Sequence, residues 1–271
     1  MRRVIGFDCG GDPLVGTIDG ATRSTGLLIV SGGNEIRSGA HRGMALLAAR
    51  IAQTGFPVFR YDRRGIGDSA GLNRGYRSSR EDLIAAAACF RATSPPLATL
   101  VALGNCDAAT TLALFGRDAG IDRILLANPW TIDAPDALPP SAAIRARYAT
   151  SLRRPSEWRR LITGGVDISK LYRGLRKISA PANETAMAQQ AIMAISGWGH
   201  DARVILAEGD ATALAFRAAA RAAGADLRIE TVDTASHSFA PAAASQALIM
   251  AVLTLLDDAQ RDYSAASAIS A

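Results

Sequence analysis

The sequence predicts an α/β fold with a mostly parallel, doubly wound sheet. Short apolar runs alternate with alanine-rich stretches of helical length along most of the chain. Strands that alternate with helices of this length form parallel βαβ units. The chain has 271 residues, of which 49% are hydrophobic and 20% charged, so one domain with an ample core and an insertion is expected.

The expected elements follow one another in a regular order. Strands are expected at residues 15–19, 27–31, 57–61, 99–103, 123–127, 203–207 and 227–232. Helices are expected at residues 43–53, 79–91, 106–115, 211–223 and 241–257. Gly55 and Pro57 end the first of these helices.

Residues 130–200 interrupt this alternation. The stretch opens with Pro135, Pro139 and Pro140 and then becomes arginine-rich and helix-like, without strand signals. We therefore expect a helical cap at 130–200, inserted into a core domain formed by residues 1–129 and 201–262. The small, polar end of the chain, 263–271, is expected to be a flexible tail.

The segment Gly104-Asn105-Cys106-Asp107-Ala108 joins an expected strand directly to an expected helix. A nucleophile on so sharp a turn needs small residues two positions before and after it, because the helix must approach the strand closely. Gly104 and Ala108 occupy these positions, although glycine is usual at both. Backbone N–H groups at the helix start favour a thiolate on Cys106. The N–H of Asp107 is the expected first oxyanion donor.

Cys106 could instead be a buried structural cysteine in a strand-to-helix turn. The neighbouring Asp107 favours this alternative, because a carboxylate beside the thiol disfavours the thiolate unless its side chain points elsewhere. The downstream residues help to decide between the two interpretations.

His237 and Asp210 are the expected partners of Cys106. His237 lies between the last expected strand and the last expected helix, where a general base follows this kind of elbow. Asp210 follows the strand at 203–207 and could orient the imidazole, although it could equally be the N-cap of the next helix. Asp233 is the alternative acid. The order Cys106, Asp210, His237 is the nucleophile–acid–base order of α/β-hydrolases.

Two loops near the expected elbow supply further candidates. Gly32, Gly33 and Asn34 follow the strand at 27–31, and the N–H of Gly33 or Asn34 is the expected second oxyanion donor. Basic side chains that could hold a carboxylate or phosphate of the substrate come next, namely Arg37, His41 and Arg42. The alternative for these three is a solvated loop.

Together these residues resemble the exosortase A system-associated hydrolases of type 1, an α/β-hydrolase-fold family. The resemblance covers residues 14–255. It rests on Gly32, Gly33, Arg37, Gly39, His41, Arg42, the loop 62–69, the elbow at 104–108, residues 128–130, Gly209, Asp210, His237 and Phe239. It implies a hydrolase encoded beside bacterial exopolysaccharide and protein-sorting machinery, with a cap after the sixth strand. It implies no known substrate.

The positive charge of the chain is concentrated in the expected cap. Between Trp130 and Trp198 there are ten basic and five acidic residues, a difference of +5, which equals the net charge of the whole chain. Ile168, Leu171, Leu175 and Ile178 share one face of an amphipathic helix that is otherwise basic. That helix could pack on the core domain, attract an anionic substrate, or contact an anionic membrane surface.

Several classes of function are not expected. No nucleic-acid-binding motif accompanies the net charge of +5, so nucleic acid is not an expected partner. Three scattered cysteines, no signal-peptide pattern and no continuous apolar run of spanning length favour the cytoplasm. Neither a metal nor an organic cofactor is expected.

The leading hypothesis is an acyl hydrolase that cleaves an ester or thioester through a Cys106–His237–Asp210 triad. Its substrate is expected to be a small-molecule or carrier-linked acyl group. One alternative is an acyltransferase that delivers the acyl group to a glycan or carrier. The other is a non-catalytic scaffold that retains the fold.

Overall fold

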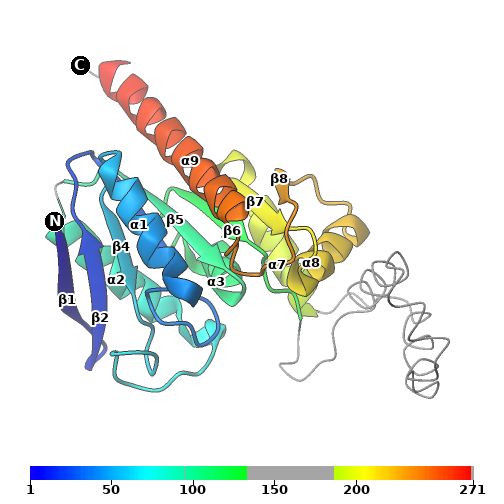
Figure 1. Cartoon of the computed structure of the whole chain (residues 1–271), viewed down its shortest axis with the longest axis horizontal. Helices are drawn as coiled ribbons and strands as arrows, with labels where there is room; N and C mark the ends of the chain where they lie inside the picture. Colours follow the sequence, from blue (N-terminus) through cyan, green and yellow to red (C-terminus); the bar gives the residue numbers. More distant parts are fainter. Residues whose placement is uncertain (95, 133–185, 270–271) are drawn as a thin grey trace.

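One eight-stranded sheet organises the part of the chain that the computed structural model describes, namely residues 1–94, 96–132 and 186–269. The strand order is β1-β2-β4-β3-β5-β6-β7-β8 (Figure 1). Pairing is antiparallel between β1 and β2 and between β2 and β4, and parallel elsewhere. The strands are β1 Arg2–Cys9, β2 Asp12–Asp19, β3 Thr25–Val30, β4 Val58–Tyr61, β5 Thr99–Asn105, β6 Arg123–Ala127, β7 Ala202–Ala207 and β8 Ile229–Val232. The expected mostly parallel α/β sheet is confirmed.

The sheet begins with a hairpin that the sequence analysis did not predict. Cys9 pairs with Asp12 across a two-residue turn at Gly10 and Gly11, whose φ values are 62° and 94°. Two consecutive positive φ angles are what a tight β-hairpin requires, and glycine adopts them without strain. The structure therefore adds β1 to the sheet and starts β2 earlier than the expected strand at 15–19.

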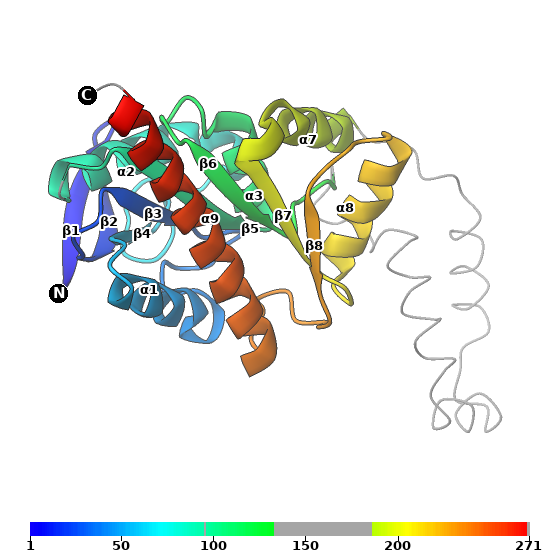
Figure 2. The same ribbon diagram turned by 90° about the horizontal axis from the view of Figure 1, so that it is seen from above.

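Helices cover both faces of the sheet. They are α1 Gly43–Gln53, α2 Arg80–Thr93, α3 Asp107–Phe115, α7 Ala186–Gly197, α8 Ala211–Ala222 and α9 Ala242–Ile269. Figure 2 shows α1 and α9 on one side and α2, α3 and α7 on the other. Alternate residues of β3 divide accordingly: Leu27 and Ile29 pack with α1 and α9, and Leu28 and Val30 pack with the opposite helices. A parallel sheet covered on both faces is apolar throughout its central strands for this reason.

Helix α7 belongs to this core, which corrects the domain boundary expected at residue 200. Ile192 and Ile195 are 3% and 1% exposed and lie in the same apolar cluster as Leu126 of β6 and Phe216 of α8. The core domain therefore resumes no later than Ala186. The rest of the expected cap, including its amphipathic helix and basic residues, lies outside the described residues.

Helix α9 extends further than expected. It runs to Ile269, so residues 263–269 of the expected flexible tail are helical. Leu248, Val252 and Leu256 are at most 3% exposed and pack on the sheet, whereas residues 261–268 are exposed (Figure 1). By length and composition alone, Ala242–Ala268 could cross a membrane, since an 18-residue window within it has a mean hydropathy of 1.4. Its packing against the sheet explains the same composition, because a core helix is also apolar.

Candidate active site

Cys106 occupies a strained turn between β5 and α3. Its backbone has φ 62° and ψ −128°, a region that non-glycine residues rarely adopt. A Cβ on Gly104 would lie 2.7 Å from the carbonyl carbon of Ala108, so only glycine allows α3 to fold back so closely. The methyl group of Ala108 is fully buried without such a conflict. The sequence of the segment thus places a thiol at the carboxyl end of the sheet, above a helix N-terminus.

His237 and Asp210 meet at the same edge of the sheet. They follow β8 and β7, and His237 Nδ1 lies 3.1 Å from Asp210 Oδ2. Burial disfavours the charged imidazole, but hydrogen bonds to Asp210 and Cys106 and the charges of both groups raise the pKa of His237 to about 10. Burial opposes the ionised form of Asp210 too, but the hydrogen bond and charge of His237 outweigh it and lower the pKa of Asp210. The structure therefore brings Cys106, His237 and Asp210 together.

The two interpretations of Asp210 hold at once. Its Oδ2 also accepts a hydrogen bond from the Ala213 N–H at 3.0 Å, so the residue is the N-cap of α8. Asp233, the alternative acid, is exposed.

Two asparagines that the sequence analysis did not single out fix the histidine loop. Asn105 Nδ2 and Asn128 Nδ2 donate to the His237 carbonyl at 3.2 and 3.0 Å. Asn128 Oδ1 accepts from the Ala207 N–H at 2.9 Å, which ties the same loop to β7. Their position could have served as a signal, since Asn105 ends β5 and Asn128 directly follows β6, and the carboxyl ends of these parallel strands meet the His237 loop.

The Asp107 side chain is held by Gly33 and Arg63. Its Oδ1 accepts the Gly33 N–H at 2.5 Å, and its Oδ2 lies 3.3 Å from Arg63 Nη2. The carboxylate is therefore paired. The Gly33 N–H, one of the two expected second oxyanion donors, is already engaged, which corrects that expectation. Asn34 follows it, and its side-chain oxygen accepts from Asn73 Nδ2 at 2.9 Å.

Comparison with solved structures reveals many similar folds. Proline iminopeptidase from Mycobacterium smegmatis aligns with a TM-score of 0.63 at 13% identity, over 96% of this chain and 100% of that chain. The α/β hydrolase GrgF from Penicillium sp. sh18 aligns with a TM-score of 0.61 at 16% identity, over 96% and 99%. The thioesterase domain of the curacin biosynthetic pathway aligns with a TM-score of 0.57 at 13% identity, over 93% and 99%.

The chain has the α/β-hydrolase fold. Comparison of the sequence with protein-family models and with curated proteins gives no match. At these identities the structural likeness concerns the fold alone. The elbow, Asp210 and His237 stand at the places where an α/β-hydrolase fold presents nucleophile, acid and base.

The basic residues in front of the elbow are placed differently from one another. Arg37 was expected to bind substrate, but its guanidinium pairs with Asp62 and with Asp68, the latter at 2.8 Å, and Nε donates to Thr17 at 3.0 Å. It fastens the loop within the protein, which corrects that expectation. His41 and Arg42 are exposed and have φ values of 51° and 60° at the start of α1. Their role in substrate binding stays a prediction.

Glu35 is a further carboxyl group near the site, in addition to Asp210 and Asp107, and the sequence analysis did not identify it. Burial raises its pKa, the charge of His237 and the Ala40 N–H lower it, and the charge of Asp107 raises it again. The net direction is upward, so burial dominates. Glu35 thus contributes charge near the imidazole from the loop that also carries Gly33.

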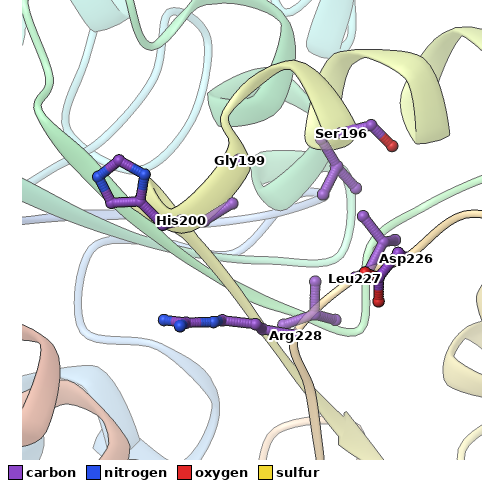
Figure 3. A pocket seen from close by; sticks show the side chains of 9 residues that line it. Ser196, Gly199, His200, Asp226, Leu227 and Arg228 are labelled. Atoms are coloured by element: carbon purple, nitrogen blue, oxygen red, sulfur yellow. The ribbon is translucent and has the colours of Figure 1, made fainter.

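A pocket of about 260 Å³, drawn in Figure 3, is formed by residues at the opposite end of the strands from the triad residues. It is lined by Ser196, His200 and Arg228 among others, next to the amino ends of β7 and β8. Within the residues that the structure describes, no three His, Cys, Asp or Glu side chains form a metal-binding group.

Proposed function

We propose that the protein is an acyl hydrolase that cleaves a carboxylic ester or thioester through a covalent thioester at Cys106. One observation supports this most strongly. The imidazole of His237 interacts with both Asp210, at 3.1 Å, and a cysteine on a strained elbow. A nucleophile, a base and a group that orients the base are the parts that acyl transfer requires.

The first half-reaction follows from this arrangement. Because Nδ1 of His237 faces Asp210, Nε2 is the nitrogen available to the thiol. Because its pKa is raised to about 10, His237 already holds the thiol proton at neutral pH. The sulfur then attacks the acyl carbonyl carbon as a thiolate, forming the C–S bond and a tetrahedral oxyanion. Collapse of this intermediate breaks the bond to the leaving group, which departs with the proton from His237.

The second half-reaction releases the acyl group. His237 accepts a proton from water while the water oxygen attacks the thioester carbonyl carbon. Collapse breaks the C–S bond, returns the proton to sulfur and yields a carboxylic acid. The expected oxyanion donors are the N–H of Asp107, at the start of α3, and that of Asn34, the remaining one of the two candidates.

The other two cysteines provide controls for this proposal. Burial and the charge of Asp82 raise the pKa of Cys9 to about 11, and burial raises the pKa of Cys89. Both are therefore poor nucleophiles at neutral pH, since the thiolate is the reactive form.

The test combines turnover with mass spectrometry of the protein after exposure to a panel of activated esters and acyl thioesters. We expect an acyl adduct on Cys106, a longer-lived adduct in His237→Gln, no turnover in Cys106→Ala, and wild-type turnover in Cys89→Ala. Turnover that survives Cys106→Ala would contradict the proposal. Alkylation of Cys106 no faster than that of Cys89 would favour the non-catalytic scaffold.

The substrate class, the cellular location and contact with a membrane are further proposals. The resemblance to exosortase A system-associated hydrolases supports a link to bacterial exopolysaccharide and exosortase systems, and the basic residues at 145–177 support an anionic substrate. A cytoplasmic location and contact with a membrane surface are untested predictions.

A further inference from the structure

Arg63 contacts both the loop that carries Gly33 and Asn34 and the elbow that carries Cys106 and Asp107. It follows β4, and its side chain is only 3% exposed. Nη2 donates to the Gly33 carbonyl and lies 3.3 Å from Asp107 Oδ2, and Nη1 lies 3.2 Å from Ser79 Oγ. A planar guanidinium with several fixed donors can hold a carbonyl and a carboxylate at the same time.

The peptide groups on both sides of Gly33 are fixed by this pair. The Gly33 N–H donates to Asp107, and the Gly33 carbonyl accepts from Arg63. The described peptide bonds are all trans, so the N–H of Asn34 points opposite to the Gly33 carbonyl. It is therefore directed away from Arg63. The loop presses on the elbow, since a Cβ on Gly32 would lie 2.3 Å from the Asn105 carbonyl oxygen and 3.2 Å from Cys106 Cβ.

We propose that Arg63 and Asp107 are positioning residues that clamp Gly33 and thereby direct the Asn34 N–H as the second oxyanion donor. Arg63 also neutralises the carboxylate that stands next to the nucleophile. This inference rests on the proposed function for the oxyanion step. The neutralisation of Asp107 by Arg63 can be tested on the reactivity of the Cys106 thiol alone, without turnover.

The charged groups around the thiol make the neutralisation of Asp107 by Arg63 measurable. His237 approaches from the loop after β8, Asp107 starts α3, and Glu35 adds a carboxyl group whose charge reaches His237 and Asp107. Arg63 supplies the positive charge nearest to Asp107 among the described ion pairs. Without it, an unpaired negative charge would adjoin Cys106 and disfavour the thiolate.

The first experiment measures the alkylation rate of Cys106 by iodoacetamide at neutral pH, followed by peptide mass spectrometry. We expect Arg63→Gln to slow alkylation about tenfold or more. The double variant Arg63→Gln/Asp107→Asn should recover the wild-type rate, because both charges are then removed. Arg80→Gln, which breaks a surface pair with Asp118, is the matched control and should behave as wild type.

The second experiment measures kcat and KM for an ester that the wild-type protein hydrolyses. Asn34→Pro removes the N–H and should lower kcat on the order of 10²-fold with little change in KM. Asn73→Ala removes the side-chain partner of Asn34 and leaves the Asn34 N–H in place, so it should retain kcat. Arg63→Lys keeps the charge but not the forked contacts, so it should alkylate normally while its kcat falls.

These outcomes separate the inference from the proposed function. If Arg63→Gln does not fold, Asp107→Asn provides the same test, with alkylation at least as fast as wild type and a lower kcat. Wild-type alkylation in folded Arg63→Gln, or equal kcat in Asn34→Pro and Asn73→Ala, would overturn the inference. Turnover in Cys106→Ala would instead overturn the proposed function and leave the alkylation result interpretable.

Discussion

Asp210 serves two partners, and a single substitution can separate them. Its Oδ2 caps α8 through the Ala213 N–H and also faces His237 Nδ1. Asparagine caps helices as well as aspartate does, but it carries no charge to hold the imidazole. We expect Asp210→Asn to keep the cap of α8 and to lose on the order of 10⁴-fold in kcat, as when the orienting acid of a triad is neutralised.

The matched control for that measurement is Asp233→Asn. Asp233 is exposed and lies on the same loop as His237, so its neutralisation should leave kcat unchanged. Equal losses in the two variants would show that general charge around the loop, rather than Asp210 itself, supports the imidazole.

The raised pKa of His237 predicts a pH-dependent contribution to stability. The folded protein holds this proton up to about pH 10, whereas an unperturbed imidazole releases it near 6.5. The stabilisation is therefore fully present below pH 6.5 and is lost as the pH rises through the folded value. Melting temperatures of wild type and His237→Gln should differ most at acidic pH and converge towards pH 10. Asp210→Asn should lower the pKa of His237 and so narrow the pH range over which this stabilisation persists. A melting-temperature difference that stays constant from acidic pH to pH 10 would contradict the raised pKa of His237.

At the level of residues, the sequence revealed which residues could act as nucleophile, base and acid, but not where the side chains around them point. Cys106, Asp210 and His237 could be found because each follows a strand, and parallel strands bring their carboxyl ends to one edge. The pairing of Asp107 with Arg63 could not be found, because side-chain direction depends on packing between distant segments. Arg37 was misassigned for the same reason, since Asp62 lies 25 residues away in the chain.

At the level of elements, the sharp turn from β5 to α3 depends on Gly104. The Cβ of an alanine there would lie 2.7 Å from the Ala108 backbone, so the helix would have to move. We expect Gly104→Ala to lower the free energy of unfolding by about 1–3 kcal/mol, as overpacking does. Chemical denaturation measures the change.

Gly197→Ala is the control for this variant. Gly197 ends α7, and a Cβ there would meet no atom within 4 Å. Its substitution should leave stability unchanged or raise it by up to about 1 kcal/mol, because alanine favours helix. A Gly104→Ala variant as stable as Gly197→Ala would mean that the elbow tolerates a wider turn.

The elements missed in the sequence analysis show what periodicity does not report. The β1–β2 hairpin carried its signal in the turn, Gly10-Gly11, rather than in the exposed strand before it. Helix α9 passed the expected end because alanine and serine at 264–268 sustain a helix without an apolar face. Most other boundaries, such as that of α1, agree with the expected ranges because a helix packed on the sheet shows a clear apolar stripe.

At the level of the whole molecule, the core domain is continuous in space although it is interrupted in sequence. Residues before 133 and after 185 share one apolar cluster, in which α7 lies next to α3 and α8. Trp198 joins the two parts, since its Nε1 donates to the Ala113 carbonyl at 2.9 Å. The triad combines them as well, with Cys106 from the first part and Asp210 and His237 from the second.

This arrangement predicts that truncation of two neighbouring residues of α7 changes the free energy of unfolding by very different amounts. Ile192 is 3% exposed within the cluster, whereas Met193 is 73% exposed. If α7 belongs to the core domain, Ile192→Ala should cost about 2–5 kcal/mol of unfolding free energy, because it removes buried methyl groups and leaves a cavity. Met193→Ala should change it by no more than about 0.5 kcal/mol. Denaturant midpoints of the two variants check this. Equal small effects would place α7 with the insertion instead, because a helix outside the core would lose little when its buried face is truncated.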